Sequence, residues 1–560
     1  MADKQHTTRS KELIFVNAPK LTSRPRKPDE GPSARSSLIR EAIRRKKAGL
    51  ARQLMETSAS NLRVFLNPGV FGKDNPETKE ELAVGVTLRQ QDAESSELEE
   101  SEIIHGHQAF AGMGSSSPRS LLSAARSDPF SPWNIELKSY GLEVLDYCVR
   151  DFWPTFRNKD YAELCYRTRF QQPSKLLVYS VLWAVAVHFD FNQGASPYQE
   201  SVKCQRYFAI MLQMVQNELA LSTAATVTDE IILAVLYIAV NYKVRGRIVR
   251  DPSPFTPPLV GIHHVDIFGT GEFHPLHWDA LKDLIRGRGG LETIQMITLP
   301  WLVTLADLFH AVGCLEKPVY PLLDLAGKPI AHSPPCQALG IAHVPHPRDS
   351  GFAKLGSLEP PVHQSIINTF QGISEYSHCL DTLSQPDSSY NLDELGDCRD
   401  IIHHRLMSLP DDEILCEFIM DLSGNPKPPF EAQHRTRFTY LLLRSAMLLY
   451  ITHVTFPLPR PLLLRQRLLG DIASHFTKVG GDFHPQVPVE LYLWPGVIAA
   501  IAARDEPCRA LFVGIVRRLC CLRMIVTYEE FLAAMRAFAW VGCACDNGAL
   551  GVWDEVRFSA

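Results

Sequence analysis

A glycine and arginine segment at residues 284–294, LIRGRGGLETI, holds the residue types that could bind a phosphate group. In a phosphate-binding loop, glycines let backbone amides approach the anion, and the loop follows a strand and opens a helix. Here the preceding residues, HWDALKDLI, have the spacing of an amphipathic helix, so the glycines come at a helix end. Glycine supplies the left-handed closure of a helix, and Arg286 and Arg288 complement the negative end of its dipole. We therefore predict a helix C-terminus and no nucleotide site.

Pairs of cysteine and histidine could ligate a metal or carry acid–base chemistry, but their spacing favours neither. Structural zinc uses paired ligands two to four residues apart, with a second pair at a suitable distance. No such second pair occurs, and no H-E-x-x-H or G-x-S-x-G pattern is present. We predict buried thiols, core or surface histidines, no metal and no cofactor. The pairs in question are Cys520 and Cys521, Cys543 and Cys545, His263 and His264, and His403 and His404.

A basic cluster near the N-terminus is the candidate with the clearest functional interpretation. It lies in SSLIREAIRRKKAGLARQLMETS, whose apolar spacing predicts a short helix near 36–55. Such clusters serve as nuclear-import signals or phosphate contacts, and a solvated run of charges in a tail is the alternative. No interleaved aromatic residues accompany it, so sequence-specific DNA contact is only weakly supported. The cluster comprises Arg40, Arg44, Arg45, Lys46, Lys47 and Arg52.

The elements that would position these residues are predicted to be helices. From about residue 129, long apolar segments have helical and not alternating spacing, and helix follows helix through short loops. This pattern predicts an all-α array of antiparallel helical hairpins over residues 125–560. Proline and glycine predict loop insertions near 243–277 and 317–362.

The composition sets broader limits. The 560 residues are 45% hydrophobic with a net charge of -5, which suits a globular protein with a substantial core. Residues 1–124 are predicted to be a mostly disordered tail, with an acidic run near 90–103. The longest apolar stretches, 176–189 and 231–242, are shorter than the roughly 20 residues that span a bilayer. We expect no membrane association, no secretory leader and reduced thiols.

The order of several segments resembles the regulatory, or middle homology, domain of fungus-specific transcription factors, in its second sequence type. The similar segments include IFVNAP at 14–19, DPFSPWNIEL at 128–137, the helix ending in R-G-G-L, LPWLVTLADLFHA, YLLLRSAMLLYI and ELYLWPGVIAAIAA. In the last segment, Pro495 and Gly496 are displaced from the usual pattern. The residues that match the motifs of the helical region are Arg288, Gly289, Gly290, Leu291, Asp307, Arg444 and Trp494.

The resemblance implies an all-helical regulatory module in a nuclear protein that controls a metabolic or biosynthetic gene set. Such regulators usually carry a binuclear zinc cluster of six cysteines before this domain, but the first cysteine here is Cys148. We therefore expect a non-enzymatic regulator that acts through partner proteins, including a DNA-binding regulator, so that any contact with DNA is indirect. A small-molecule effector in a cavity between helices is part of this hypothesis.

Two alternatives belong to other classes of protein. One is a biosynthetic enzyme whose site lies in the helical cavity and uses His263, His264 or His310, which predicts titratable groups that converge in one pocket. The other is a helical scaffold with neither ligand nor DNA.

Overall fold

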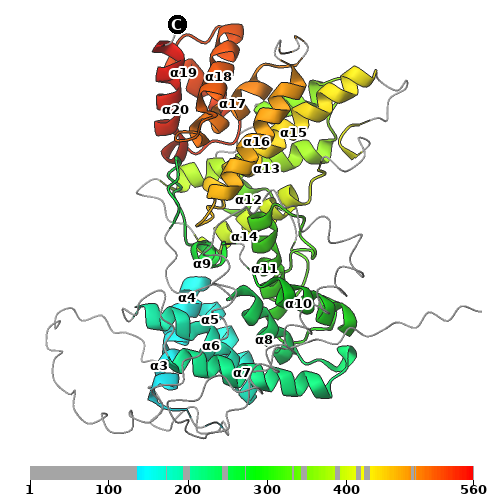
Figure 1. Ribbon diagram of the computed structural model, residues 1–560, viewed down its shortest axis with the longest axis vertical. Coiled ribbons are helices and arrows are strands. Elements are labelled where there is room, and N and C mark those ends of the chain that lie inside the picture. Colours follow the sequence, from blue (N-terminus) through cyan, green and yellow to red (C-terminus); the bar gives the residue numbers. More distant parts are fainter. Residues whose placement is uncertain are drawn as a thin grey trace, which may run out of the picture. The chain divides into compact units, whose positions relative to one another are not determined.

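A computed structural model of the chain describes Ile135 and residues 137–558, with internal gaps. The predicted tail, with its basic helix near 36–55 and its acidic run near 90–103, lies outside the described residues. In the described part the fold is all-α, as predicted, and contains no strand (Figure 1). Two isolated β-bridges join Leu323 to Pro329 and Val362 to Met420. The gaps are at residues 172, 193–201, 242–249, 271–272, 331–332, 342–349, 385–390, 412–417, 422–428, 481–482, 484 and 486.

The first group of helices is built around α6 and α8. The apolar α6 packs against α3, α7 and α8, and eight of the twelve residues of α8 are buried. Side chains cap two of these helices: Asn158 Oδ1 accepts from the Tyr161 amide at 2.7 Å, and Thr228 starts α8 in the same way. The helices are α3 (Ser139–Tyr147), α4 (Trp153–Phe156), α5 (Lys159–Arg169), α6 (Lys175–Asn192), α7 (Val202–Leu221) and α8 (Asp229–Val240).

A π-helical turn, η1 (Cys148–Phe152), connects α3 to α4 without a break. Such a turn holds one residue more than an α-helical turn and is common at functional sites. Trp153 and Phe156 follow it directly, and both side chains are buried. The turn therefore sets the direction in which two large aromatic rings enter the core.

The middle of the chain supplies the helices that close this first group. Helix α10 packs along α8, and α11 contacts α8, α9 and α14. Short helical segments occur in the described parts of both regions that were predicted as loop insertions. The elements are η3 (Ile262–His264), α9 (Val265–Phe268), α10 (Pro275–Arg288), η4 (Leu291–Thr293), α11 (Leu299–Cys314), α12 (Pro335–Ala338) and η6 (Gly351–Ser357).

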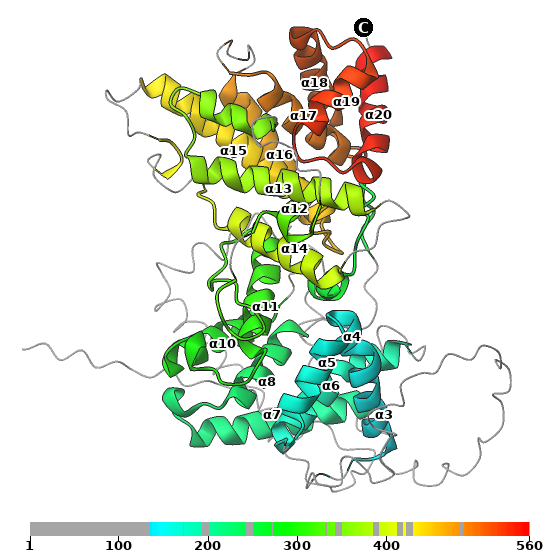
Figure 2. The ribbon, with the colours of Figure 1, turned by 180° about the vertical axis from the view of Figure 1, so that it is seen from behind.

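The C-terminal group of helices packs around α15 and α17 (Figure 2). Every residue of α17 is buried, and α15 packs against both α16 and α17. The described helices include none with the length and apolar character that crossing a bilayer requires. The helices are α13 (Gln364–Leu383), α14 (Leu392–Met407), α15 (Phe430–His453), α16 (Leu462–Val479), α17 (Glu490–Ala502), α18 (Arg509–Arg523), α19 (Tyr528–Arg536) and α20 (Gly542–Phe558).

Candidate functional site

An apolar pocket lies among the helices of the first group. Its empty volume is about 670 Å³, part of it open to solvent, and residues of η1, α4, α5, α6, α8, α9 and α11 line it. The enclosed part is much smaller, about 70 Å³, so the pocket suits only a compact molecule. Its lining is mostly apolar with a few polar groups, as in small-molecule sites. Aromatic rings form much of the wall: Phe152, Trp153, Phe156, Phe268, Phe273 and Phe309.

Three polar side chains interrupt the apolar lining: Tyr161, Tyr237 and Asn241. Tyr237 and Asn241 are four residues apart at the end of α8, so they lie on one face. The Asn241 side-chain amide donates to the Tyr237 carbonyl at 3.0 Å. Its Oδ1 atom is buried and has no hydrogen-bond partner. A buried acceptor without a donor is unfavourable, so this atom is suited to accept from a bound molecule.

Arg169, the last residue of α5, lies beside these tyrosines and is only 3% exposed. Its Nη2 atom donates to the Thr298 hydroxyl, and its guanidinium also forms a side-chain hydrogen bond with Tyr237. Its Nε and Nη1 atoms are buried without partners. In the described part of the chain no carboxylate pairs with it. A permanently charged group is thus buried without a counter-ion, which is costly for a folded protein.

Two buried histidines pack behind the pocket wall. His188 and His264 both pack against Phe152 and Phe268, which line the pocket. Burial, together with the neighbouring His264, lowers the pKa of His188 to about 3. Burial lowers the pKa of His264 to about 4, although a hydrogen bond with Thr155 opposes the shift. Both rings are therefore neutral at neutral pH.

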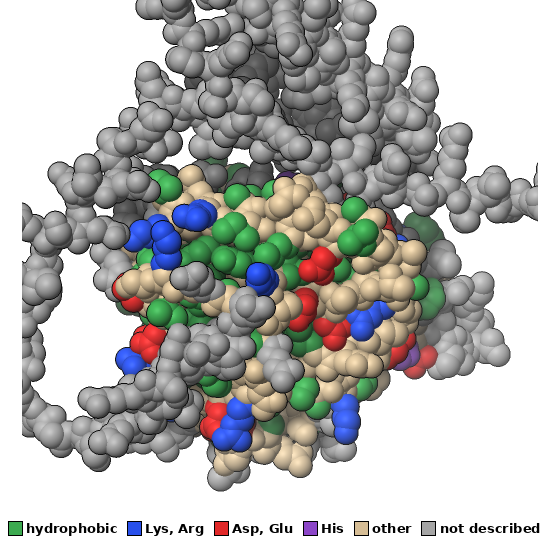
Figure 3. All heavy atoms as spheres, turned by 90° about the horizontal axis from the view of Figure 1, so that it is seen from below, with side chains coloured by type: hydrophobic (Ala, Val, Ile, Leu, Met, Phe, Trp, Pro, Cys, Tyr) green, Lys and Arg blue, Asp and Glu red, His purple; other side chains and the backbone are tan. Residues whose placement is uncertain are grey.

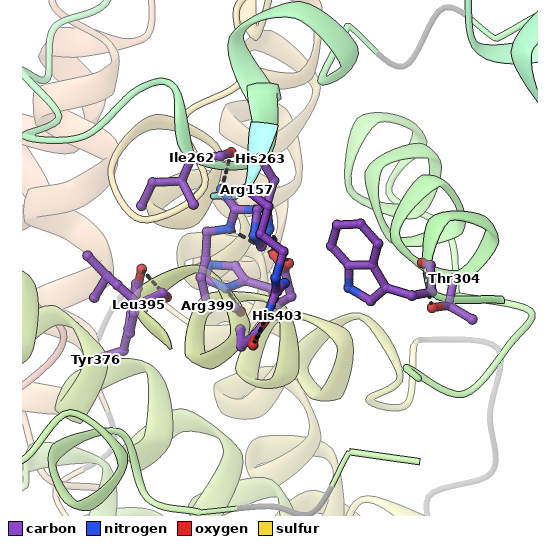
Figure 4. A network of polar contacts seen from close by, with 11 residues as sticks. Arg157, Ile262, His263, Thr304, Tyr376, Leu395, Arg399 and His403 are labelled. Carbon is purple, nitrogen blue, oxygen red and sulfur yellow. Dashed lines mark hydrogen bonds and ion pairs between the residues drawn. The ribbon is translucent and has the colours of Figure 1, made fainter. Parts of the chain in front are cut away.

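A second cluster of buried polar groups lies where α14 meets η3 and α11 (Figure 4). Asp400 is its centre: Oδ2 lies 2.9 Å from His263 Nδ1, and Oδ1 accepts from Arg399 Nε at 2.8 Å and Nη2 at 2.7 Å. Burial acts to raise the pKa of Asp400, but Arg399 and His263 together hold it below its usual value. Arg399 Nη1 also donates to the Ile262 carbonyl at 2.9 Å. In contrast to Arg169, this buried cation has a full set of partners.

Further contacts connect the same cluster to the end of α4 and to the segment that follows α15. His403 Nδ1 donates to the Arg399 carbonyl at 2.5 Å, and its Nε2 lies 2.8 Å from the Thr455 hydroxyl. Burial lowers the pKa of His403 to about 3. Arg157 forms two hydrogen bonds with Asp397, at 2.9 and 2.7 Å. These contacts connect α4 and the segment after α15 to α14.

The backbone at His263 and His264 is strained. Both residues have left-handed conformations, with φ of 50° and 51°, which residues with side chains rarely adopt. The ring of His263 lies against Gly396 of α14, where a Cβ atom would stand 2.7 Å from the ring. Strain of this kind persists only where surrounding contacts fix the conformation, and the Asp400 contact does so here.

The Asp400 and His263 pair has the form of an acid–base dyad without a nucleophile. The His263 Nε2 atom is buried without a partner, and the ring packs edge-on against Trp301 at 5.7 Å. Among the described residues, no serine, threonine or cysteine is hydrogen-bonded to His263. His310 packs instead against Phe273 and Trp278. The structure therefore brings His263 and His264 together but places His310 in a different set of contacts.

The glycine turn at the end of α10 closes a helix, as predicted. Gly289 is left-handed, with φ of 112°, and its amide donates to the Arg286 carbonyl at 3.1 Å. The amide of Gly290 donates to the Ile285 carbonyl at 2.9 Å. Both amides are thus used by the helix end itself, and neither is left to bind a phosphate group.

Arg288 fastens this turn to the start of α8. Its Nη1 atom forms an ion pair with Asp229, and its Nη2 atom donates to the Thr293 carbonyl at 2.8 Å. Asp229 also accepts from the amides of Gln295 and Met296, at 2.9 and 2.6 Å. The arginine of the R-G-G-L motif therefore holds α8, α10 and the following loop together.

The other residues of the family motifs also take part in packing. Leu291 and Trp494 are buried, and Trp494 Nε1 donates to the Ala539 carbonyl at 3.1 Å. Asp307 accepts from the amides of Val319 and Tyr320, at 2.6 and 2.9 Å, while burial raises its pKa to about 6. Arg444 has one buried Nε atom without a partner.

The cysteines do not form a metal site in the described residues, where no cluster of histidine, cysteine or carboxylate side chains could hold an ion. Cys520 and Cys545 are buried, whereas their neighbours Cys521 and Cys543 are exposed. All twelve described cysteines are free thiols. The basic cluster from Arg40 to Arg52 lies outside the described residues.

Sequence reasoning missed the polar end of the pocket. One available signal was the spacing of Tyr161, Cys165 and Arg169, which are four residues apart and so place an arginine on an otherwise apolar face of α5. A second was the spacing of Tyr237 and Asn241 in a segment that is otherwise apolar. The pairing of His263 with Asp400, 137 positions away, left no signal in the sequence.

In comparisons with known proteins, no family model, curated protein or solved structure matches the chain. The likeness to the fungal regulatory domain stays a prediction from the order of segments. What the protein does is therefore inferred from the pocket and its surroundings.

Proposed function

We propose that this protein is a nuclear, non-enzymatic regulator of transcription that controls a metabolic or biosynthetic gene set. It acts through partner proteins, one of them a DNA-binding regulator, and its own contact with DNA is indirect. A small molecule bound in the pocket is its effector. The observation that carries the proposal is an apolar pocket in a helical domain, with one buried polar atom of its lining, Asn241 Oδ1, left without a hydrogen-bond partner.

The contacts of the predicted motif residues support this proposal. An all-helical module with a R-G-G-L turn at a helix end is what the resemblance to the fungal regulatory domain implies. Arg288, Gly289 and Asp307 hold helices and loops in place and contact no open site. Such roles fit a regulatory module better than an enzyme, whose motif residues would gather around the reacting atoms.

The surface offers room for a protein partner. Figure 3 shows the described helices from below, where hydrophobic side chains gather in the middle of the face and charged side chains stand around them. At the two ends of α7, Val202 and Leu221 are 82% and 89% exposed. Exposed apolar surface with a charged surround is common at sites of protein contact.

The proposal is tested by comparing cells with and without the gene. A regulator changes many transcripts and is recovered with chromatin and with a DNA-binding subunit, whereas an enzyme changes metabolites first. A variant with Arg44, Arg45, Lys46 and Lys47 changed to alanine should no longer enter the nucleus. It should therefore reproduce the transcript changes seen when the gene is deleted. A matched control replaces Lys20, Arg24, Arg26 and Lys27, which removes the same charge.

Two results would contradict the proposal. Altered metabolites with unchanged transcripts would point to an enzyme. Unchanged nuclear uptake of the four-alanine variant would show that the basic cluster is not the import signal.

A further inference from the structure

The strongest unexplained feature of the fold is the positive charge of Arg169. The side chain is 97% buried, since only 3% of its surface is exposed, and two of its nitrogen atoms have no hydrogen-bond partner. Arginine keeps its proton under all conditions in which proteins fold, so deprotonation cannot relieve the cost of burial. A structural role alone would be met by an apolar side chain of similar volume at lower cost.

The groups around Arg169 do not neutralise it. The ionisable side chains nearest to it are Cys165, Tyr161 and Tyr237. Burial raises the pKa of Tyr237 to about 12 and that of Tyr161 well above its usual value, so both hydroxyls stay neutral at neutral pH. Thr298, which accepts from Nη2, is uncharged as well. Among the residues that the structure describes, the site thus has a cation and hydroxyl groups but no anion.

The same tyrosines connect Arg169 to the pocket. Tyr161 and Tyr237 both adjoin the arginine and both line the cavity, whereas Arg169 itself is not a lining residue. A tyrosine hydroxyl that accepts from a guanidinium keeps its own hydrogen to donate, and the positive charge strengthens that donation. One turn further along the chain, Asn241 offers the unpartnered Oδ1 atom as an acceptor. This end of the pocket therefore presents a donor beside a positive charge, and an acceptor nearby.

We infer that the pocket binds a compact, mainly apolar carboxylic acid that also carries a hydroxyl group. The carboxylate accepts from Tyr237, which is hydrogen-bonded to Arg169, so that its negative charge balances the arginine from the pocket side. The hydroxyl donates to Asn241 Oδ1, and the aromatic wall covers the apolar body. This inference rests on the proposed function, because it names the chemical class of the effector of the same pocket. No bond is made or broken in the site.

Calorimetric titration of the full-length protein with three small probes tests the inference. The probes are para-hydroxybenzoate, its methyl ester, which removes the charge, and para-methylbenzoate, which removes the hydroxyl. A charge-assisted hydrogen bond distinguishes the first two, so the acid should bind about tenfold more tightly than the ester. The methyl compound should bind more weakly than the hydroxy acid, because Asn241 Oδ1 then stays without a donor.

Substitution of Arg169 identifies the source of the preference. In Arg169→Met the acid and the ester should bind equally, because the positive charge is gone. The matched control is Arg167→Met on the same helix, where the side chain is 71% exposed and pairs with Glu163; it should keep the tenfold preference. Tyr237→Phe, which keeps the ring, should reduce the preference and serves as a second variant if Arg169→Met fails to fold.

Three outcomes would overturn the inference. The first is equal binding of acid and ester by the wild-type protein, and the second is an unchanged preference for the acid in Arg169→Met. The third is an increase in the thermal stability of the protein by sodium chloride that equals the increase by the acid, which would indicate a bound inorganic anion. Each leaves the proposed function intact if transcripts still respond to loss of the gene. Conversely, unchanged transcripts with tight acid binding would reject the proposed function alone.

Discussion

The two regions around the buried arginines differ in how completely their polar groups are partnered. Arg399 of α14 is 1% exposed, pairs with Asp400, donates to the Ile262 carbonyl and lies 4.5 Å from the centre of the Phe456 ring. Arg169 of α5 is 3% exposed, and the described residues around it offer hydroxyl groups and other neutral side chains. Two similarly buried positive charges thus differ in their partners: Arg399 has a carboxylate beside it, and Arg169 has neutral groups.

The difference separates structural from binding roles. A buried charge with its counter-ion and hydrogen bonds fixes how elements meet, and the Arg399 cluster does so between α14, η3 and α11. A buried charge for which the described residues provide no counter-ion is costly to the fold, and this cost is what a bound anion would relieve. The prediction for each region follows from this distinction.

Replacing each arginine with methionine removes one buried charge at a time and should have opposite effects on stability in the two regions. Arg399→Met leaves Asp400 buried without its main partner and should lower the free energy of unfolding by about 3–5 kcal/mol. Arg169→Met should leave it unchanged or raise it by up to about 1–4 kcal/mol, because it removes a costly buried charge and leaves no opposite charge behind. Urea-induced unfolding at neutral pH measures both.

A double variant checks the explanation for Arg399. In Arg399→Met with Asp400→Leu neither charge remains, so part of the lost stability should return. If the double variant is no more stable than the single one, the loss came from packing and not from an unpaired carboxylate.

Two of the buried histidines, His188 near the pocket and His403 in the Arg399 cluster, make stability depend on pH. Both have pKa values near 3 in the folded protein, whereas a histidine of the unfolded chain has a pKa near 6.5. Below pH 6.5 the unfolded chain takes up the proton first, so stability falls with falling pH, by about 2 kcal/mol per histidine at pH 5. His188→Phe should remove one such contribution, which stability curves between pH 5 and 7 would detect.

The variants at the two histidines should differ at neutral pH. The His188 Nε2 atom has no hydrogen-bond partner, so replacing His188 should lower the free energy of unfolding only slightly. Replacing His403 removes two hydrogen bonds and should lower it more. The exposed His434 provides a control, and His434→Phe should leave the pH dependence as it is. An equal acid sensitivity of His188→Phe and the wild-type protein would contradict the assignment of His188 as a buried neutral ring.

The smallest expected effects come from two glycines, one at the end of α10 and one within α18. Gly289→Ala places a side chain at φ of 112° and should lower the free energy of unfolding by about 1 kcal/mol. Gly514→Ala lies within α18 with open space around it and should raise it by roughly 0.5–1 kcal/mol. Thermal unfolding compares the two variants, and a stabilising Gly289→Ala would refute the role of this residue in closing α10.

The helical fold could be predicted from the sequence because its signals are local. The spacing of apolar residues identified the buried segments of α6 and α8, and the order of helix and glycine identified the end of α10. Both depend on residues within a few turns of one another.

The candidate site could not be predicted, since it depends on distant contacts. A charged residue such as Arg169 is expected at the surface, and the sequence does not show that Thr298 and Tyr237 enclose it. The partners of His263 were missed for the same reason, although the residue itself was considered as a candidate.

The position of the cavity wall depends on the number of residues in the π-helical turn at Cys148–Phe152 more than on which residues these are. Losing one residue there would restore a regular α-helix and rotate Trp153 and Phe156 by about 100° about its axis. Both rings would then leave the wall of the cavity that they now line. Related proteins that lack one residue at this turn should therefore keep the helices but lose the cavity.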